Sequence, residues 1–589
     1  MVLYGAPLAV EGTAQTPFST AAFAAAGQAY FNNLLSALAM RADPDAVARL
    51  QAPAGPAAAL CALQARYQQE HFALWQSALA RQAGFDTPAA SSAQRGMGDR
   101  RFAAAAWRTN PYFDYLRRSY LLNAQFLTEV VETLELEQSA RERLRFVTRQ
   151  FVDAMSPANF AATNPEALEL ALETRGESLS AGLRNLTGDV EKGRISTSDE
   201  SVFEVGRNLA ATEGAVVYEN PLMQLIQYAP RTARQHARPL LMVPPCINKF
   251  YILDLQPDNS LARHALEQGH NVFMVSWRNV LAAEGHHTWD DYLESGVIKA
   301  LEVARDISGA DQVNALGFCV GGTLLCSALA VLKGRGEQPA ASLTLLAAML
   351  DFSDTGDIGL FVDEASVAAR EAAIGSGGIM PGRDLAFIFS ALRANDLVWP
   401  YVVNGYLKGK SPPAFDLLYW NADSTNLPGP MYCWYLRNAY LENNLRVPGR
   451  LSMLGVPVDL GQLDCPAYIV AARDDHIVPW HTAYASTQLL GRDRRGAMRF
   501  ILGASGHVAG IVNSAIRNKR SYWTATGLPA DPQAWLAQAV EHPGSWWRDW
   551  SEWLAPLGGE PRQAGKTLGG NRHRPIEAAP GRYVKQRVA

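Results

Sequence analysis

The sequence predicts a protein of the α/β class, in which a mostly parallel sheet follows a helical N-terminal region. From residue 201 onward, short apolar and β-branched runs alternate with segments of helical periodicity, which is typical of parallel strands joined by helices. Residues 1–200 instead carry apolar residues at spacings of three and four, the pattern of amphipathic helices. One interval between predicted strands, 350–466, is far longer than a crossover requires, which indicates an insertion.

These observations divide the chain into five segments. We expect a helical N-terminal domain at 1–200 and an α/β core in two parts, 201–354 and 456–557. A cap, 355–455, is inserted between the two parts of the core and is rich in aromatic and amide residues. A basic tail rich in Gly and Pro, 558–589, ends the chain, and we expect it to be loosely ordered.

The first domain contains its strongest helical signal at 116–155, where charged residues separate the apolar ones. Asn164 followed by Pro165 predicts the start of another helix, because Asn caps helices and Pro is well tolerated at the first helical position.

The core is predicted to contain eight strands and two long helices. The helices are 289–308 and 321–336. The strands are 214–220, 222–230, 238–245, 271–277, 312–318, 341–349, 467–472 and 498–505. Near the end of the core, four tryptophans between 546 and 553 recur at helical spacing, and we expect this stripe to pack in the interior.

Composition excludes several classes of protein. The 589 residues are 48% hydrophobic and 19% charged, as in globular rather than disordered chains. The net charge of −4 gives no indication of the concentrated basic surface that binds nucleic acid. The histidines and cysteines form no CxxC or HxxxH pattern, so we expect no metal site. No signal peptide or apolar run of membrane-spanning length is visible, so we expect a cytoplasmic protein without a transmembrane segment.

The chemistry is centred on residues 316–322, LGFCVGG. A predicted strand, then Gly-x-Cys-x-Gly, then a predicted helix is the context of a nucleophile elbow. The sequence therefore predicts an α/β-hydrolase fold with Cys319 as its nucleophile. The N-terminus of the following helix directs partial positive charge at the sulfur, which favours the thiolate.

The acid and the base follow in the order that such folds use. Asp475 comes after the strand 467–472, and His507 comes after the strand 498–505. The adjacent Asp474 is interpreted as a solvated neighbour. His476 is a candidate substrate-binding residue or a neighbour that supports the acid.

Two backbone N–H groups should form the oxyanion hole. One belongs to Val320, directly after the nucleophile, and the other to Cys246 or Ile247 in the loop after the strand 238–245. In the same loop, Asp254 is a second candidate for contact with substrate, with a structural hydrogen bond as the alternative.

Cysteine in place of serine indicates thioester chemistry. When a thiolate attacks a thioester, one thioester replaces another, so the acyl group stays activated for a later transfer to a hydroxyl. The sulfur therefore suits an enzyme that takes acyl groups from coenzyme A and makes oxygen esters.

The chain resembles the poly(3-hydroxyalkanoate) synthases, specifically the single-polypeptide class that prefers short-chain monomers. The resemblance runs from residue 99 to the end. It is carried by strings such as DAMSPANFAATNPEA (153–167), LLMVPPCINKFYILDLQP (240–257), LGFCVGG, NADSTNLPGPMYCWYLRNAYL (421–441), RDDHIVPW (473–480) and LGASGHVAG (502–510). Two departures lie in the cap, at Pro400 and at GSGGIMPG (375–382), and they bear on cap mobility or monomer range.

By this resemblance, Cys319, Asp475 and His507 match the catalytic residues of the family. The family polymerises (R)-3-hydroxyacyl-CoA, mainly 3-hydroxybutyryl-CoA, and releases CoA. It works as a homodimer on the surface of polyhydroxyalkanoate granules, where granule-associated proteins are further partners. The CoA thioester is the substrate, so the resemblance implies no bound cofactor.

Two other functions are compatible with the elbow alone. A small cysteine hydrolase such as dienelactone hydrolase has a similar elbow but lacks the long front segment and the cap. A granule-coat protein without activity would not need an intact triad on three strand ends.

Overall fold

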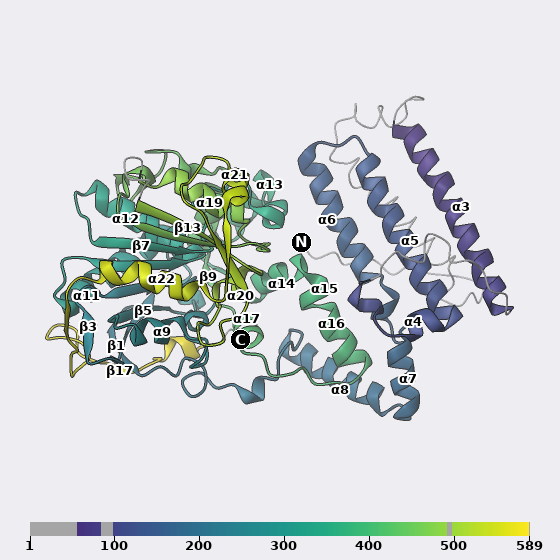
Figure 1. The fold of residues 1–589 in the computed structure, drawn as a ribbon, viewed down its shortest axis with the longest axis horizontal. Helices are drawn as coiled ribbons and strands as arrows, with labels where there is room; N and C mark the ends of the chain where they lie inside the picture. The colour runs from purple at the N-terminus through teal and green to yellow at the C-terminus, as the bar shows by residue number, and fades with distance from the viewer. Residues whose placement is uncertain (1–55, 84–97, 492–496, 588–589) are drawn as a thin grey trace. The chain divides into compact units, whose positions relative to one another are not determined.

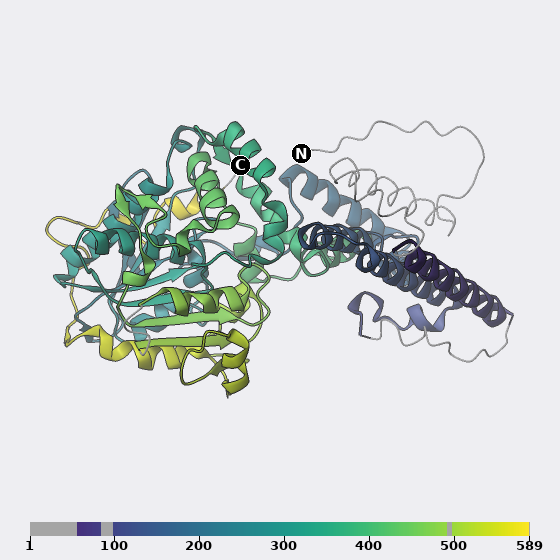
Figure 2. The ribbon, with the colours of Figure 1, turned by 90° about the horizontal axis from the view of Figure 1, so that it is seen from above.

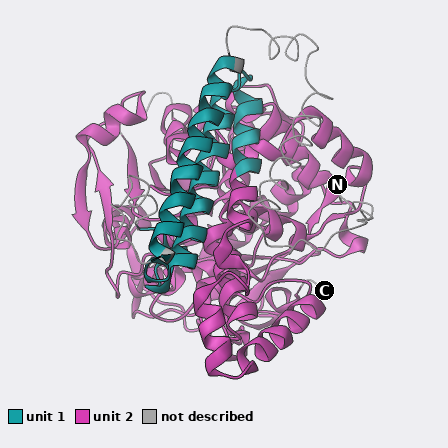
Figure 3. Cartoon of the chain, turned by 90° about the vertical axis from the view of Figure 1, so that its right-hand side faces the viewer, with its two compact units in different colours: residues 1–148 teal, residues 149–589 magenta. Residues whose placement is uncertain are grey.

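The computed structural model describes residues 56–83, 98–491 and 497–587. The chain forms two compact units, 1–148 and 149–589 (Figure 3). The sequence placed the end of the helical domain near residue 200. The two helices before that point, α7 (Pro165–Glu173) and α8 (Glu177–Lys192), group with the second unit because α8 packs against residues 402–407 of the cap. In the described part of the chain, no helix has the length and apolar character needed to cross a membrane.

The first unit is built around two packed helices, α3 (Pro56–Gln82) and α5 (Pro111–Thr133). The Tyr67 hydroxyl donates to Asn123 Oδ1 at 2.7 Å between them. A short helix, α4 (Ala106–Thr109), precedes α5, and α6 (Gln138–Ala154) follows it across the boundary between the units. The predicted helical segment 116–155 is thus two helices with a break at 134–137.

The second unit contains an eleven-stranded sheet in the order β15-β14-β13-β12-β7-β6-β4-β5-β2-β1-β17 (Figure 1). Its six central strands are parallel, whereas β1 and β2 run antiparallel at one side. The strands are β1 (Gly214–Glu219), β2 (Met223–Tyr228), β4 (Leu240–Val243), β5 (Val272–Trp277), β6 (Val313–Phe318), β7 (Ala340–Leu346), β12 (Ala467–Ala472), β13 (Met498–Gly503), β14 (Ser521–Thr524), β15 (Val540–Pro543) and β17 (Glu577–Ala578). All eight predicted strands are confirmed.

Helices cover both faces of this sheet (Figure 2). Along β6, Val313 and Ala315 belong to one apolar layer, and Leu316 and Phe318 belong to the other, since successive side chains of a strand point to opposite faces. The first layer packs under α11 (Lys299–Ser308), α12 (Val320–Gly334) and α19 (Trp480–Leu489). The second packs under α9 (Leu261–Glu267) and α22 (Trp546–Leu554).

The tryptophan stripe of α22 lies in this second layer. Trp546, Trp547 and Trp550 are at most 2% exposed, which confirms the predicted interior packing. The predicted helix 289–308 is also present, although its middle, Tyr292–Ile298, is a π-helical segment.

The C-terminal tail is fixed to the core, so the expectation of a loosely ordered tail is wrong. Strand β16 (Pro561–Gln563) pairs with β3 (Arg234–His236), and β17 pairs with β1. Tyr583 and Val584 are buried, and Lys249 Nζ donates to the carbonyl of Gln586. The basic and Gly-rich composition of the tail does not predict this attachment, because the attachment depends on backbone pairing and a few apolar side chains.

The cap connects β7 to β12 and meets the carboxyl ends of the parallel strands. Thr425 N donates to Ile247 O at 2.8 Å, and Trp420 Nε1 donates to Lys249 O at 2.7 Å, so the cap contacts the loop after β4. The main cap helices are α13 (Glu364–Ile374), α14 (Gly382–Leu392), α17 (Asp416–Asn421) and α18 (Gly429–Tyr435), followed by the π-helical turn η10 (Leu436–Leu441).

Candidate active site

Cys319 occupies a strained turn between β6 and α12. Its φ is +52° and its ψ is −128°, a conformation that residues other than Gly rarely adopt. A Cβ at Gly317 would lie 2.4 Å from Gly322 Cα, and a Cβ at Gly321 would lie 2.3 Å from Val243 O. The two flanking glycines therefore permit the close approach of helix and strand that holds the sulfur at the sheet edge, as the elbow motif predicts.

Asp475 lies in the turn after β12, and both oxygens of its carboxylate have hydrogen-bond partners. Oδ1 accepts hydrogen bonds from the backbone N–H groups of Ile477 and Val478, both at 2.8 Å. Oδ2 lies 2.7 Å from Nδ1 of His507. Two backbone donors thus orient one oxygen while the other holds the imidazole.

His507 begins the short helix α20 (His507–Ile511) after β13. Its ring stacks on Phe318, with ring centroids 5.6 Å apart, and the residue is 7% exposed. Burial acts to lower the pKa of His507, but the Asp475 carboxylate and a hydrogen bond with Cys319 outweigh it and raise the pKa to about 10. The sequence-predicted residues Cys319, Asp475 and His507 are therefore brought together.

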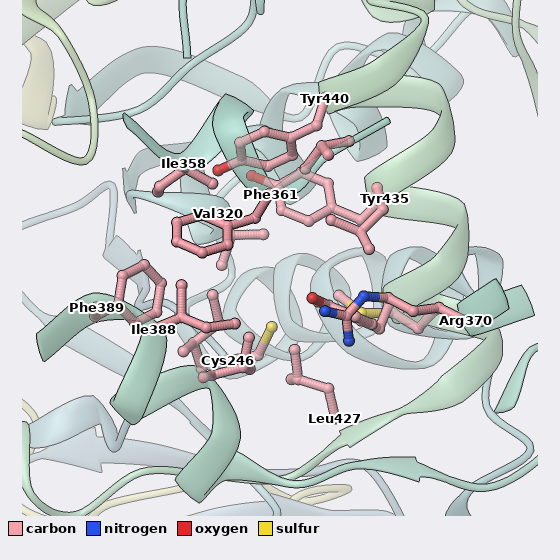
Figure 4. Close-up of a pocket in the computed structure, with 16 residues that line it drawn as sticks. Cys246, Val320, Ile358, Phe361, Arg370, Ile388, Phe389, Leu427, Tyr435 and Tyr440 are labelled. Atoms are coloured by element: carbon pink, nitrogen blue, oxygen red, sulfur yellow. The ribbon is translucent and has the colours of Figure 1, made fainter. Parts of the chain in front are cut away.

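The candidate oxyanion-hole residues line one cavity. Val320, Cys246 and Ile247 line it together with side chains of the cap, several of which are labelled in Figure 4. Val320 is the first residue of α12, and the first N–H groups of a helix have no partner within it. The cavity volume is about 60 Å³, so the cap side chains lie close to the candidate oxyanion-hole residues.

Cys246 directs its sulfur toward this cavity (Figure 4). Burial, together with the nearby Cys319, raises the pKa of Cys246 to about 12. The side chain is therefore a neutral thiol at physiological pH, unsuited to attack a thioester, because the thiolate is the nucleophile.

Asp254 does not take part in the site, which corrects its interpretation as a substrate-binding residue. It is 1% exposed, and its carboxylate accepts hydrogen bonds from Thr212 Oγ1 at 2.5 Å, Ser260 Oγ at 2.6 Å and Tyr228 OH at 3.1 Å. Both carboxylate oxygens of Asp254 therefore accept hydrogen bonds from these hydroxyls. Through them, Asp254 joins the chain before β1 to the loop after β4. The alternative of a structural hydrogen bond was the right one.

The two neighbours of the acid differ. Asp474 is exposed, as expected. His476 is half-buried, and its Nδ1 is buried without a hydrogen-bond partner among the described residues. Burial lowers the pKa of His476 to about 4, so it is neutral beside the catalytic pair, and its contact with substrate stays a prediction.

The sequence did not indicate which residues of the cap line the cavity. Tyr435, Tyr440, Phe361 and Arg370 line the cavity together with Val320. The only indication in the sequence is that the cap is rich in aromatic residues. That composition does not show which of the rings point into the cavity. Among the described residues, no group of three or more His, Cys, Asp or Glu side chains is arranged to hold a metal ion.

The comparisons with known proteins agree with this geometry. A model described as the poly-beta-hydroxybutyrate polymerase (PhaC) N-terminus matches residues 98–265, and a model of the alpha/beta hydrolase fold matches residues 239–514. The poly(3-hydroxyalkanoate) polymerase subunit PhaC of Cupriavidus necator is 57% identical, covering 89% of this chain and 88% of that protein.

More distant relatives carry the same name. The poly(3-hydroxyalkanoate) polymerase of Methylorubrum extorquens is 40% identical over 89% of this chain and 86% of its own. Poly(3-hydroxyalkanoate) polymerase 1 of Ectopseudomonas oleovorans is 38% identical over 83% of this chain and 87% of its own. With an α/β-hydrolase fold, a cysteine elbow and relatives that match it over most of its length, this chain belongs to the family of poly(3-hydroxyalkanoate) polymerases, acyltransferases that polymerise hydroxyalkanoate units.

Proposed function

We propose that the enzyme polymerises (R)-3-hydroxyacyl-CoA, mainly 3-hydroxybutyryl-CoA, through a covalent acyl group on Cys319, with release of CoA. The observation that carries the proposal is the 2.7 Å contact between Asp475 and His507 beside a cysteine held at φ +52° in the elbow. A nucleophile, a base and a group that orients the base are thereby assembled.

Acylation is the first step. The Cys319 thiol gives its proton to His507, and the thiolate attacks the thioester carbonyl carbon. The bond between that carbon and the CoA sulfur breaks, and CoA leaves with the proton from His507. The negative oxygen formed in between accepts hydrogen bonds from the Val320 N–H and from an N–H of the loop at Cys246 and Ile247.

Transfer to a hydroxyl is the second step. The 3-hydroxyl of the next monomer gives its proton to His507, and its oxygen attacks the acyl-cysteine carbonyl. The carbon–sulfur bond to Cys319 breaks, and the sulfur recovers the proton. The product is one ester unit longer and still a CoA thioester, so it can acylate Cys319 again.

The raised pKa of His507 supports the acylation step, because it favours the pair in which the proton of Cys319 already lies on the imidazole and the sulfur is a thiolate. The cap side chains that line the cavity beside Val320 support ester formation over hydrolysis, because a largely apolar lining limits the access of water to the acyl-cysteine.

The same proposal covers partners and location. The CoA thioester enters as substrate, and no resident cofactor takes part in the steps above. We place the enzyme in the cytoplasm, associated with polyhydroxyalkanoate granules through its growing polyester chain, with granule-associated proteins as further partners. The active form is a homodimer.

The test is a CoA-release assay with 3-hydroxybutyryl-CoA that also identifies the product. We expect one CoA per monomer consumed and an insoluble polyester. Cys319→Ala should abolish both and retain the fold, and Cys319→Ser should keep at most a trace of activity, because a hydroxyl is a far poorer nucleophile at neutral pH.

The matched control is Cys61→Ala, since Cys61 is an exposed free thiol in the other unit. It should leave the rate unchanged. CoA release with only free 3-hydroxybutyrate as product would instead assign a hydrolase, and normal polymer from Cys319→Ala would refute the covalent mechanism.

A further inference from the structure

The helix α8 exposes an aliphatic stripe made of four side chains. Leu179, Leu183, Leu186 and Val190 are 40%, 64%, 39% and 71% exposed. Their spacing of four, three and four residues places them in one row along the helix. Helices of globular proteins normally turn such a row toward the core. A row that faces solvent therefore indicates a surface that binds something apolar.

The residues that α8 turns inward are small or polar. Ser178, Gly182, Asn185 and Asp189 have the same spacing as the aliphatic stripe and precede its members by one position, which is a rotation of about 100° around the helix. This inner row faces the π-helical segment η9 (Val402–Leu407) of the cap, along which α8 packs (Figure 1). The usual arrangement of an amphipathic helix is thus reversed.

The contact between α8 and the cap fixes the orientation of the helix. Asn185 Nδ2 donates to Gly405 O at 2.9 Å, and Tyr406 OH donates to Asp189 Oδ2 at 2.8 Å. A Cβ added at Gly182 would overlap the carbonyl oxygen of Tyr406, so the two backbones are in direct contact. The exposure of the aliphatic stripe is therefore a property of a firmly packed helix.

The charges on α8 indicate what kind of surface the stripe binds. The exposed charged residues of the helix are Glu177, Arg184, Glu191 and Lys192, so the two signs cancel. Helices that bind anionic lipid surfaces carry an excess of Lys and Arg on their polar side. The balance on α8 instead suits an apolar surface that has no charge of its own.

The composition of the stripe argues against a protein partner. Trp, Tyr and Arg supply most of the binding energy at protein interfaces, whereas Leu and Val are under-represented there. Four side chains on one helix also provide much less area than the roughly 800 Å² per partner of a standard interface. An uncharged, aliphatic surface without fixed side-chain positions fits the stripe better.

The product of the proposed reaction is such a surface. A polyester of 3-hydroxybutyrate presents methyl groups and uncharged esters, and it separates from water as an insoluble phase. We propose that the aliphatic stripe of α8 binds the surface of the polyester that the enzyme makes. This contact is additional to the covalent chain on Cys319 and independent of it. The inference rests on the proposed function, which supplies the polyester.

The experiment measures binding without the covalent chain. Full-length Cys319→Ala enzyme is sedimented with protein-free particles of poly(3-hydroxybutyrate), because this variant cannot carry a growing chain. Leu183→Ser and Val190→Ser are then added together, since they alter the two most exposed members of the stripe. We expect the affinity for the particles to fall by about 10- to 100-fold, because each side chain loses the gain from its burial on the polymer.

The matched control replaces two equally exposed apolar residues of the same unit outside α8. Ile516, which lies between α20 and β14, is 68% exposed, and Val540, at the start of β15, is 60% exposed. Ile516→Ser with Val540→Ser, also in the Cys319→Ala background, should bind the particles as its parent does. Equal melting temperatures for all three proteins show that they are folded.

The other possible occupants of the stripe are tested in parallel. Vesicles of phosphatidylcholine, with and without phosphatidylserine, replace the particles in one arm, and analytical ultracentrifugation follows the oligomeric state in another. If the α8 substitutions abolish vesicle binding, or dissociate a dimer, and leave polyester binding unchanged, the stripe belongs to a membrane or to a second copy, and the inference is wrong. An equal loss of polyester binding in the control variant would also overturn it.

One further measurement separates this inference from the proposed function. With Cys319 intact, the α8 double variant should release CoA from 3-hydroxybutyryl-CoA in a single turnover at the wild-type rate. If the wild type makes no polyester, the proposed function fails. If the wild type makes polyester but the α8 substitutions do not weaken particle binding, the proposed function stands and the role of the stripe is refuted.

Discussion

Cys319 is held in an unfavourable backbone conformation by the residues around it. A non-Gly residue at positive φ costs on the order of 1–3 kcal/mol, and here the surrounding sheet and helix supply the stability that maintains it. The Cys319 N–H donates to Leu346 O of the neighbouring strand at 2.9 Å. The glycines on either side allow α12 to approach β6 and β4 closely. The strained turn thus places the sulfur at the strand ends, within reach of the imidazole.

At the same scale, Asp254 is expected to matter for stability and not for substrate binding. Asp254→Ala leaves three hydroxyls in a buried site without their acceptor, which should cost on the order of 3–5 kcal/mol of unfolding free energy. Asp254→Asn keeps one acceptor oxygen and should cost less. Denaturant unfolding measures both effects.

The matched control for this prediction is Asp474→Ala, which removes an exposed carboxylate and should change stability by less than about 0.5 kcal/mol. The KM of folded Asp254→Asn for 3-hydroxybutyryl-CoA should equal that of the wild type. A raised KM with unchanged stability would restore Asp254 as a substrate-binding residue.

At the scale of the elements, the sequence predicted the features that depend on a short stretch of the chain. Each strand of the core is a short apolar run, and Cys319, Asp475 and His507 each follow such a run in a turn, so position along the chain was enough to place them. The antiparallel strands β14 and β15 escaped prediction because they are partly exposed and lack a continuous apolar pattern.

The cap residues escaped prediction for a different reason. Tyr435 and Tyr440 come to line the cavity beside Val320 only through the folding of an insertion that contains two π-helical segments. Neither strand nor regular helix periodicity predicts which side chains of such segments point inward. For the same reason, the partners of Asp254 became visible only when β2, the chain before β1 and the loop after β4 were brought together.

The cap must open for substrate, because a cavity of about 60 Å³ is far smaller than the roughly 300–1,000 Å³ of sites that hold ligands of cofactor size. We expect opening to be coupled to dimer formation, with substrate favouring the dimer. Phe387 on α14 of the cap is 75% exposed and is suited to pack on a second copy. Specific activity should therefore rise with protein concentration, and the lag before polymerisation should shorten.

Activity assays beside analytical ultracentrifugation test this coupling. Phe387→Ser should weaken the dimer and lengthen the lag. Leu172→Ser, which alters an equally exposed apolar residue outside the cap, is the control and should do neither. Specific activity that stays constant over concentrations where the dimer dissociates would contradict the coupling.

At the scale of the whole molecule, the parts of the second unit depend on one another across long stretches of sequence. The tail closes one side of the sheet through β17 and covers the loop after β4 through Gln586. Another section of the tail, β16, pairs with β3, which carries His236. Next to His236 lies His270, just before β5, so stability in this region depends on residues from three distant segments.

His270 makes the stability of this unit depend on pH. It is 1% exposed, its ring stacks on His236 with centroids 4.6 Å apart, and neither of its ring nitrogens has a hydrogen-bond partner among the described residues. Burial, with the neighbouring His236 and His264, lowers the pKa of His270 to about 3. The unfolded chain takes up this proton near pH 6.5, whereas the folded chain does so only near pH 3. Folding stability is therefore fully present above pH 6.5 and is lost as the pH falls from 6.5 toward 3.

This one histidine should cost about 1.4 kcal/mol of unfolding free energy for each pH unit below about 6.5, or about 2 kcal/mol between pH 7 and pH 5. His270→Phe keeps an aromatic ring against His236 and removes the titrating group, so it should flatten the pH dependence by that amount. His286→Gln, which alters an exposed histidine, is the control and should leave the dependence as in the wild type. Denaturant unfolding of the three proteins at pH 7, 6 and 5 measures the difference. Parallel curves for the wild type and His270→Phe would show that His270 does not take up its proton on unfolding.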